Sequence, residues 1–530
     1  MGAFKQNMGR LTRRDFFKSG SLLGSLALFS RAAAAPPPSE ALRIGPDIYQ
    51  SIGVRPFING VGTLTVNGGS LELPEVRAAM DAAAQHMVQL DELMEAVGKR
   101  LAELTGAEWG IVTAGCAAAM SVATLACVAG GDPDKHIRLP NMDGLGKDEV
   151  IIPKHSRNNY DAAIRAVGVR IIEVNSAQEL ESAIGPRTAM IYIFAGPQAE
   201  TGTPSYDEII RIARQRNIPV LTDAAAEILT IPNVHLQRGA TMVAYSGGKQ
   251  LRGPQCSGLL LGRKNLVSAA WIHSAPHHGF ARFMKVGKEE IIGALTAVEV
   301  WVKRDNKALW RQMLDQLNHI ANGVSSIPGV ITEVREPEGL SNRSPGLNIR
   351  WDAAKLGISG QQLAQILDIT DPRILVGSSR GAQNGISITA FNLRPGDEKI
   401  IADRLRGVLS APPAQKEQEP PKAPITDLSG VWDVQIEYRA GVGLHTLSLR
   451  QQGGRIQGIH RGEFIARDLN GLIDGDTVRL QSRLPESAIG NALSFTFTGK
   501  VSGETMSGEL DMGEYLKARW SARRHRNGQG

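Results

Sequence analysis

A lysine stands in a glycine-containing run, Ser246-Gly247-Gly248-Lys249, directly after a predicted buried strand at residues 241–245. Glycine lets the backbone approach a bound ligand closely, and the Ser246 hydroxyl can donate a hydrogen bond to a phosphate. The amine of a lysine held between two buried strands can condense with an aldehyde. We therefore predict that Lys249 is a catalytic residue that forms a Schiff base, rather than an ordinary surface lysine.

An acidic residue, Asp223, ends the preceding predicted strand, PVLTD at residues 219–223. A carboxylate at that place can pair with a pyridinium nitrogen and keep it protonated, which makes the ring an electron sink. Taken alone, an aspartate at a strand end is more often a helix N-cap. Its position before Lys249 favours the pairing role.

A third segment, TAGCAAAM at residues 113–120, runs from a strand end into a helix whose first residues are small. Free backbone N–H groups and the positive end of a helix dipole together make a phosphate cradle. We expect Gly115, Cys116 and Ala117 to form that cradle. The alternative is a tight packing turn.

The elements that must position these residues follow one another as strand and helix. Short apolar runs alternate with amphipathic stretches between about residues 75 and 265. This alternation predicts an α/β fold with a mostly parallel sheet covered on both faces, and ligands bind beyond the carboxyl ends of such strands. The expected strands are residues 110–113, 149–152, 170–174, 189–194, 219–223, 241–245 and 258–262.

The later part of the chain divides into three further segments. A long helical pattern at residues 288–322 leads into a smaller α+β domain that ends near residue 410. Residues 411–424, APPAQKEQEPPKAP, have the composition of a linker. Period-two patterns and regular turns over residues 425–530 then predict a small antiparallel β barrel or sandwich, which we interpret as a binding or packing module.

The order of these motifs resembles the fold-type I pyridoxal phosphate (PLP) enzymes, an aminotransferase class V-like group. Within that group, the chain is similar to the branch of L-seryl-tRNA(Sec) selenium transferase and D-glucosaminate-6-phosphate ammonia-lyase. The resemblance extends from about residue 48 to residue 409. It rests on INGVGT at 58–63, TAGCAAAM at 113–120, KHSRNNYD at 154–161, Asp223, SGGKQLRGPQCSG at 246–258 and MKVGKEE at 284–290.

The resemblance implies the PLP-dependent transferase fold, with a seven-stranded sheet, a large PLP-binding domain over residues 36–290 that includes an N-terminal arm, and a small domain over residues 291–410. It also implies a homodimer or larger homo-oligomer. Lys249 would hold the cofactor, Asp223 would pair with its ring nitrogen, and Ser246 would help the Gly115 loop to bind its phosphate. His155 would cover the ring, although a helix-capping or core histidine is an equal alternative.

Substrate binding is expected to use arginine, because the planar guanidinium binds a carboxylate or phosphate through two parallel hydrogen bonds. Each candidate could instead form a structural ion pair. Arg252 and Arg282 are the first choices, because they lie beside the Lys249 and MKVGKEE motifs. The full set is Arg157, Arg252, Arg282, Arg380 and Arg394.

The first 35 residues predict a twin-arginine export signal, because TRRDFFK at residues 12–18 precedes a short apolar run and a small-residue cleavage site. This segment has six basic residues and one acid, a net charge of +5, so subtraction from the total of +6 leaves +1 for the remainder. The basic balance therefore gives no support for a nucleic-acid partner. We expect a periplasmic or secreted protein without a membrane span after cleavage.

These features together predict an exported PLP enzyme that acts on a small amino acid or amino sugar acid through an α-carbanion. Lyase-type elimination is the first choice, and aminotransferase or racemase chemistry uses the same carbanion. Selenium transfer on tRNA is disfavoured by the export signal. A non-catalytic binding protein on a PLP-fold scaffold is another alternative. No metal site is expected, and three cysteines allow at most one disulfide.

Overall fold

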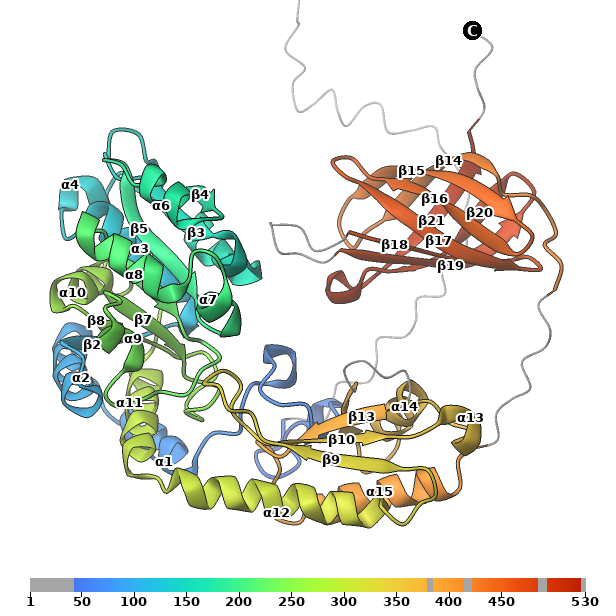
Figure 1. Cartoon of the computed structure of the whole chain (residues 1–530), viewed down its shortest axis with the longest axis horizontal. Coiled ribbons are helices and arrows are strands. Elements are labelled where there is room, and N and C mark those ends of the chain that lie inside the picture. Colours follow the sequence, from blue (N-terminus) through green and yellow to red (C-terminus); the bar gives the residue numbers. More distant parts are fainter. Residues whose placement is uncertain (1–41, 379–384, 414–421, 485–492, 526–530) are drawn as a thin grey trace, which may run out of the picture. The chain divides into compact units, whose positions relative to one another are not determined.

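A computed structural model describes residues 42–378, 385–413, 422–484 and 493–525. The chain divides into two units, Met1–Pro56 and Phe57–Gly530. In the first unit, the described residues contain one short 3-10 helix, Gln50–Ile52, which ends at Gly53 in the left-handed conformation. The second unit contains a large α/β domain, a smaller α+β domain and a β barrel (Figure 1).

The large domain is built on the expected mostly parallel, seven-stranded sheet, in the order β2-β8-β7-β6-β5-β3-β4. β8 pairs antiparallel with both of its neighbours, and the other adjacent strands are parallel. Most of these strands are apolar and buried along their length, as expected for a sheet covered on both faces. The strands are β2 (Trp109–Thr113), β3 (Glu149–Pro153), β4 (Arg170–Val174), β5 (Thr188–Phe194), β6 (Val220–Asp223), β7 (Met242–Ser246) and β8 (Gly258–Gly262).

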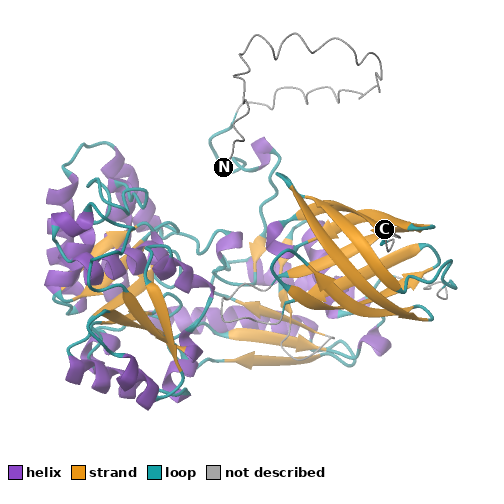
Figure 2. Cartoon of the chain, turned by 90° about the horizontal axis from the view of Figure 1, so that it is seen from above, coloured by secondary structure: helices purple, strands orange, loops and turns teal. Residues whose placement is uncertain are grey.

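Helices pack on both faces of this sheet (Figure 2). α3 (Gly115–Ala129) is buried along nearly its whole length, because it is apolar on all sides and contacts β8, β7 and β5. α8 (Tyr206–Arg216) is amphipathic and begins with a capping box at Ser205. The remaining helices of this domain are α1 (Pro74–Ala84), α2 (Leu90–Thr105), α4 (Pro133–His136), α5 (Ala162–Arg165), α6 (Ala177–Ala183), α7 (Pro197–Thr201), α9 (Val234–Arg238) and α10 (Lys264–Ile272).

The prediction of a single long helix at residues 288–322 is wrong, because two helices occupy that segment. α11 (Lys288–Lys303) ends at Arg304, and α12 (Asn306–Val324) starts after Asp305. The Asp305 carboxylate accepts hydrogen bonds from the backbone N–H groups of Lys307 and Ala308, so it caps the new helix and ends the old pattern.

The small domain has a four-stranded antiparallel sheet in the order β12-β13-β10-β9. A separate short strand, at residues 374–375, pairs in parallel with the INGVGT segment, and Ile58 lies opposite Ile374. The strands are β1 (Ile58–Asn59), β9 (Ile331–Arg335), β10 (Gly346–Arg350), β11 (Ile374–Leu375), β12 (Gly377–Ser378) and β13 (Gly385–Thr389), and the helices are α13 (Ala353–Leu356), α14 (Gly360–Ile369) and α15 (Asp397–Ser410).

The C-terminal domain is a closed antiparallel barrel in which each strand pairs with the next and β21 returns to β14. Buried and exposed residues alternate along its strands, so one side-chain set fills the interior. The barrel form is therefore correct and the sandwich alternative is not. Its strands are β14 (Gly430–Glu437), β15 (Val442–Gln452), β16 (Arg455–Arg461), β17 (Ala466–Asp474), β18 (Thr477–Arg483), β19 (Ser494–Ser502), β20 (Thr505–Asp511) and β21 (Lys517–Arg524).

Three further observations concern only the described residues. No helix among them is long and apolar enough to cross a membrane, and no group of histidine, cysteine or acidic residues is arranged to hold a metal ion. Cys116, Cys127 and Cys256 are all free thiols.

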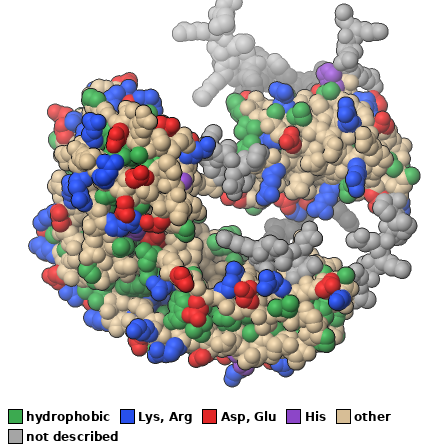
Figure 3. Space-filling model, in the orientation of Figure 1, with side chains coloured by type: hydrophobic (Ala, Val, Ile, Leu, Met, Phe, Trp, Pro, Cys, Tyr) green, Lys and Arg blue, Asp and Glu red, His purple; other side chains and the backbone are tan. Residues whose placement is uncertain are grey.

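On the face of the large domain drawn in Figure 3, basic and acidic side chains are interspersed.

Candidate active site

Three predicted site features meet at one edge of the large-domain sheet. Asp223 ends β6, Lys249 follows the neighbouring strand β7, and Cys116 lies in the first turn of α3. The Cys116 thiol donates a hydrogen bond to Oδ1 of Asp223 at 3.7 Å. Burial raises the pKa of both the Asp223 carboxyl and the Cys116 thiol, and the charge of Lys249 opposes the rise in both.

The Asp223 carboxylate is 1% exposed and is held by several donors. The backbone N–H of Ala225 donates to Oδ1 at 3.0 Å, and the hydroxyl of Tyr192 donates to Oδ2 at 2.9 Å. Burial raises the pKa of the Asp223 carboxyl above its ordinary value, and these hydrogen bonds oppose the rise. A buried carboxylate without a basic hydrogen-bond partner is suited to pair with a protonated ring nitrogen.

Tyr192 is a site residue that the sequence reasoning missed. It lies on β5 next to β6, and Nδ2 of Asn158 donates to its hydroxyl oxygen at 3.2 Å. A buried tyrosine needs a partner for its hydroxyl, so a tyrosine in an otherwise apolar run such as AMIYIF was the available signal. Asn158 belongs to the KHSRNNYD motif, and its role is to hold Tyr192.

The start of α3 is open, as a phosphate cradle requires. Gly115 has φ +85°, a conformation that favours glycine, and Ala117 in the first turn is exposed. Gly258 of β8 makes this close approach possible, because a Cβ there would lie 2.4 Å from the carbonyl carbon of Gly115. Ser246 pairs with Gly258 across β7 and β8, so the predicted helper serine lies beside the cradle.

The loop that carries Lys249 folds tightly because its glycines have no side chains. The N–H of Gly247 donates to the Ser257 carbonyl at 2.8 Å, and a Cβ at Gly247 would lie 2.0 Å from Oγ of that serine. A Cβ at Gly248 would lie 2.4 Å from the Cα of Gln255. Lys249 itself is half-buried, and its amine makes no hydrogen bond or ion pair with any residue that the structure describes.

His155 follows β3 in the 3-10 helix Lys154–Ser156, and its ring is fixed at both nitrogens. Its Nε2 lies 2.9 Å from the Pro204 carbonyl oxygen and its Nδ1 lies 3.2 Å from the Ser156 hydroxyl. A carbonyl oxygen only accepts, so Nε2 carries the hydrogen and Nδ1 accepts from the serine. A Cβ at Gly202 would lie 2.6 Å from the ring, so the ring also packs closely against the chain.

The arginine candidates have different surroundings. Arg157 forms ion pairs with Asp161 at 2.5 Å and Glu173 at 3.0 Å, which is the structural alternative for this residue. Arg252 has φ +57°, and its Nε donates to the Leu71 carbonyl at 2.9 Å. Two candidates, Arg282 and Arg394, are exposed. Arg380 lies outside the described residues.

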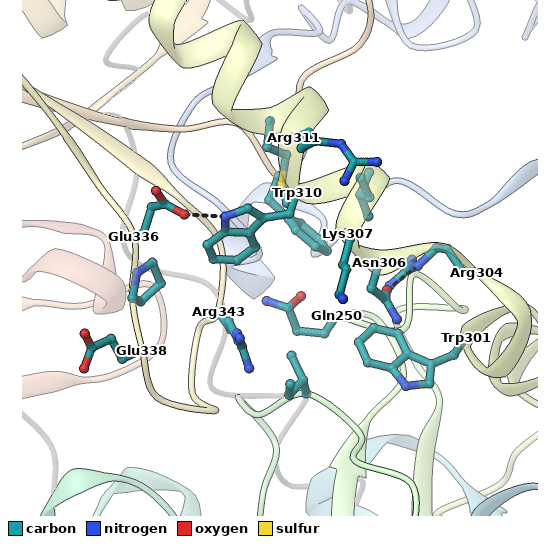
Figure 4. Close-up of a pocket in the computed structure, with 15 residues that line it drawn as sticks. Gln250, Trp301, Arg304, Asn306, Lys307, Trp310, Arg311, Glu336, Glu338 and Arg343 are labelled. Atoms are coloured by element: carbon teal, nitrogen blue, oxygen red, sulfur yellow. Dashed lines mark hydrogen bonds between the residues drawn. The ribbon is translucent and has the colours of Figure 1, made fainter.

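A cavity of about 770 Å³ opens beside Gln250, the residue after Lys249 (Figure 4). Both α12 and the segment after β9 contribute to its lining. Its basic residues are Arg304, Lys307, Arg311 and Arg343, and its acidic residues are Glu336 and Glu338.

Arg304 is one of the basic residues in this lining that the sequence reasoning did not select. Its Nη1 is buried without a hydrogen-bond partner among the described residues. Burial and the nearby charge of Arg252 lower the pKa of Arg304 to about 10. The signal that could have located it is the following residue, Asp305, which caps α12 and so places Arg304 between the two helices.

A second cavity, of about 460 Å³, also has Gln250 and Phe391 in its lining. The INGVGT motif forms one wall, where Oδ1 of Asn59 accepts hydrogen bonds from the N–H groups of Val61 and Gly62. The wall is joined to the small domain because the N–H of Thr389 donates to the Gly60 carbonyl. Both cavities thus reach the loop of Lys249 from the small-domain side, although Lys249 is not part of either lining.

A mostly parallel sheet that gathers a buried carboxylate, an unpaired amine and an open helix start at its strand ends has the architecture of the fold-type I PLP enzymes. The residues present fit the cofactor, because an anionic partner for the ring nitrogen, free N–H groups for the phosphate and an amine for the aldehyde lie on adjacent elements. Residues 73–278 match the aminotransferase class-V family, and the chain belongs to this family of PLP-dependent enzymes.

Known relatives show which branch the chain is similar to. A D-glucosaminate-6-phosphate ammonia lyase from Salmonella typhimurium is 31% identical over 68% of this chain and 98% of the relative. A 5'-C-glycyluridine monooxygenase-decarboxylase from a Streptomyces species is 32% identical over 68% and 92%. An L-seryl-tRNA(Sec) selenium transferase from Moorella thermoacetica is 24% identical over 71% and 82%.

A solved structure agrees with these sequence relationships. The structure of a D-glucosaminate-6-phosphate ammonia-lyase superposes with a TM-score of 0.62 at 29% identity, and the match covers 69% of this chain and 99% of the other. The resemblance to this branch, the fold class and the PLP cofactor are therefore confirmed.

Proposed function

We propose that this enzyme removes the α-proton of an amino acid or amino sugar acid and that the reaction continues by elimination, as in an ammonia-lyase. The observation that carries the proposal is the 31% identity, over 98% of its length, with a protein named for ammonia release from an amino sugar acid phosphate. The gathering of Asp223, Lys249 and the start of α3 at one sheet edge supports it.

Each group at the sheet edge has one task in this proposal. When bound, PLP supplies an electron sink for charge that develops at the α-carbon of an amine substrate. Asp223 binds the ring nitrogen and keeps it protonated, while Tyr192 and Ala225 hold the carboxylate in place. The N–H groups at the start of α3 and the Ser246 hydroxyl bind the phosphate.

Proton transfer is the task of Lys249. Its amine is free of hydrogen bonds to the described residues, so no protein contact has to break before it acts. It takes the proton from the α-carbon as a general base and can return a proton to the departing group. Two hydrogen bonds hold the ring of His155 in one orientation, and in this proposal the ring covers the cofactor.

The cavities beside Gln250 support an anionic substrate. Arg304 and Arg343 line the larger cavity, and Arg335 lines the smaller one. A carboxylate or phosphate that binds next to Arg304 would supply the hydrogen-bond acceptor that Nη1 of Arg304 lacks within the described chain. In this proposal the small domain therefore selects acidic substrates, and the sheet edge performs the chemistry.

The test has two parts. Purified protein reconstituted with PLP is expected to show an absorbance band at about 420 nm, and a screen of amino acids and amino sugar acids is expected to find one that releases ammonia. Lys249→Ala is expected to lose both, whereas Lys99→Ala, an exposed lysine on α2 paired with Glu95, is expected to keep both. A colourless wild type that cannot be reconstituted would contradict PLP chemistry.

A second candidate function is oxidative decarboxylation of an amine substrate, because the Streptomyces relative named for that chemistry is 32% identical over 92% of its length. The two reactions differ in their co-reactant. Oxygen uptake with release of carbon dioxide would favour this candidate, and ammonia release without oxygen uptake would favour elimination. Keto acid formation with transfer of the amino group would instead indicate transamination, and inversion without either product would indicate racemisation.

Export and assembly complete the proposal. Residues 1–35, which lie outside the described residues, carry the twin-arginine motif that supports delivery to the periplasm or the medium. Replacing Arg13 and Arg14 with lysine is expected to leave the protein in the cytoplasm of an expressing bacterium. We also propose a homo-oligomer, which light scattering of the purified chain would test; a monomer with full activity would contradict it.

A further inference from the structure

A chain of hydrogen-bonded polar side chains lies inside one end of the barrel. Nδ1 of His445 and Nε2 of His460 are 2.7 Å apart, and Nδ1 of His460 is 2.7 Å from the Ser482 hydroxyl. The Tyr438 hydroxyl lies 3.3 Å from Nε2 of His445. A barrel interior that served only to pack would be filled by apolar side chains, as the rest of this one is.

Arg467 stands in the same layer and lacks the partners that a buried cation needs. It lies opposite His460 across β16 and β17 and is 7% exposed. Its Nε and Nη1 are buried without a hydrogen-bond partner among the described residues. Its guanidinium carbon lies 4.8 Å from the centroid of the Phe495 ring. Buried polar groups are normally satisfied, so these nitrogens indicate an acceptor from outside the chain.

Among the described residues, no carboxylate forms a salt bridge with Arg467. Burial lowers the pKa of Arg467, and the phenol of Tyr438 is the titratable group among the described residues that opposes this. Burial lowers the pKa of His460 to about 3 and also lowers the pKa of His445, so both rings are neutral at physiological pH. Among the described groups of this layer, the guanidinium therefore carries the charge, and it is positive.

A cavity of about 340 Å³ opens at this end of the barrel. Tyr438 and Phe495 line the cavity and also contact the Arg467 layer, although Arg467 itself is not part of the described lining. Small-molecule sites start at about 300 Å³ and combine apolar walls with a few placed polar groups. The lining as described is Tyr438, Arg439, Ala440, Leu493, Phe495, Met512, Tyr515 and Lys517.

The interior beyond this layer is packed by apolar side chains. Trp432 is fully buried in that part of the barrel, and its Nε1 donates to the Leu428 carbonyl at 2.9 Å. A ligand would therefore enter at the Tyr438 end and stop at the polar layer. Its outer part would contact Phe495, Met512 and Leu493.

We propose that the C-terminal barrel is a binding site for a small carboxylate with an apolar or aromatic body, and that Arg467 binds the carboxylate. A carboxylate is an acceptor-only group whose oxygens match the unpaired guanidinium nitrogens. This site is distinct from the large-domain sheet edge, because every residue that forms it lies within the barrel strands and their loops. It gives the barrel a function that the family match over residues 73–278 does not cover.

Calorimetric titration of the full PLP-loaded chain tests the proposal with phenylacetate and its uncharged analogue phenylacetamide as probes. We expect saturable binding of one phenylacetate per chain, and binding of the amide roughly tenfold weaker or more. This comparison needs no variant. Equal binding of acid and amide, or no binding of phenylacetate up to about 10 mM, would overturn the proposal.

Substitution locates the site. Arg467→Gln is expected to weaken phenylacetate binding roughly tenfold or more while the visible absorbance of bound PLP is unchanged. The matched control is Arg461→Gln, an exposed arginine at the end of β16, which is expected to bind like the wild type. Circular dichroism shows whether Arg467→Gln is folded; if it is not, Tyr438→Phe at the mouth replaces it. Unchanged affinity in the folded variant would assign Arg467 a packing role against Phe495 and overturn the proposal.

Discussion

Tyr192 on β5 donates a hydrogen bond to Oδ2 of Asp223 at 2.9 Å, and two helices, α7 and α8, separate β5 from the strand of the aspartate, β6. The Tyr192 hydroxyl and the Ala225 N–H hold the two oxygens of the carboxylate from different sides. Both donors stabilise the charged form, which opposes the burial that raises the pKa of Asp223. The carboxylate that we assign to the cofactor is thus oriented before any ligand binds.

Removing that hydrogen bond is expected to weaken cofactor binding. Tyr192→Phe takes away a donor that both orients Asp223 and favours its anionic form, so the PLP dissociation constant is expected to rise roughly three- to tenfold. Equilibrium titration of the apoprotein at about 420 nm measures it. The control is Tyr206→Phe, because Tyr206 is a buried tyrosine whose hydroxyl is hydrogen-bonded to Thr222 and not to Asp223. Equal dissociation constants for the two variants would contradict a specific role for Tyr192.

The burial of Asp223 is expected to cost the apoprotein stability at neutral pH. Because the folded pKa lies above the ordinary 3.8, the native state binds more protons than the unfolded state between these two values. The free energy of unfolding of the wild type therefore rises as the pH falls from the folded pKa toward 3.8. Asp223→Asn carries no charge, so it is expected to be more stable than wild type by about 1 kcal/mol at neutral pH.

Urea unfolding of both apoproteins over a pH series checks this expectation. The advantage of Asp223→Asn should shrink on acidification through the raised pKa, since the wild-type carboxyl then becomes neutral as well. Asp315→Asn, an exposed position on α12, is the control and should match the wild type throughout. An advantage that stays constant with pH would show that it does not come from the Asp223 charge.

The close approach of β8 to the start of α3 depends on Gly258. Gly258→Ala would place a Cβ 2.4 Å from the Gly115 carbonyl carbon and 2.6 Å from the Cys116 nitrogen, so the start of α3, which we propose binds the phosphate, has to shift. We expect a loss of about 2 kcal/mol or more of stability and weaker PLP binding, measured by thermal unfolding and titration.

Gly407→Ala gives the matched control for that substitution. No atom lies within 4 Å of a Cβ at Gly407, and the residue is exposed within the helix α15. Alanine there should stabilise the protein by up to about 1 kcal/mol with no change in PLP binding. If both glycine variants behaved alike, the contact between β8 and α3 would not be the cause.

The three thiols are expected to differ in reactivity. Burial and the neighbouring Asp223 raise the pKa of Cys116 well above its ordinary value, and burial raises the pKa of Cys127 to about 12. Cys256 is exposed. Since the thiolate is the reactive form, a disulfide reagent at mildly alkaline pH should label one thiol in the native apoprotein and three after unfolding. Rapid labelling of a second thiol in the native state would contradict the buried position of Cys116.

The sequence by itself determined the elements and the main chemical residues. Period-two and apolar runs depend on local patterning, so the seven large-domain strands and the barrel strands were predictable from the chain alone. The same holds for the relation of Asp223 and Lys249, because both follow neighbouring parallel strands, whose carboxyl ends must meet. The catalytic role of Lys249 stays a prediction.

Only the tertiary structure decided which partners those residues have. The hydrogen bond from Tyr192 to Asp223 and the ion pair of Arg157 with Glu173 each join side chains from separate elements. The Nε and Nη1 atoms of Arg467 are buried without a hydrogen-bond partner among the described residues. Such contacts depend on register and on which face of a strand a residue occupies, and a shift of one residue would reverse the face. Local sequence patterns do not contain that information, so the packing of the whole chain decides it.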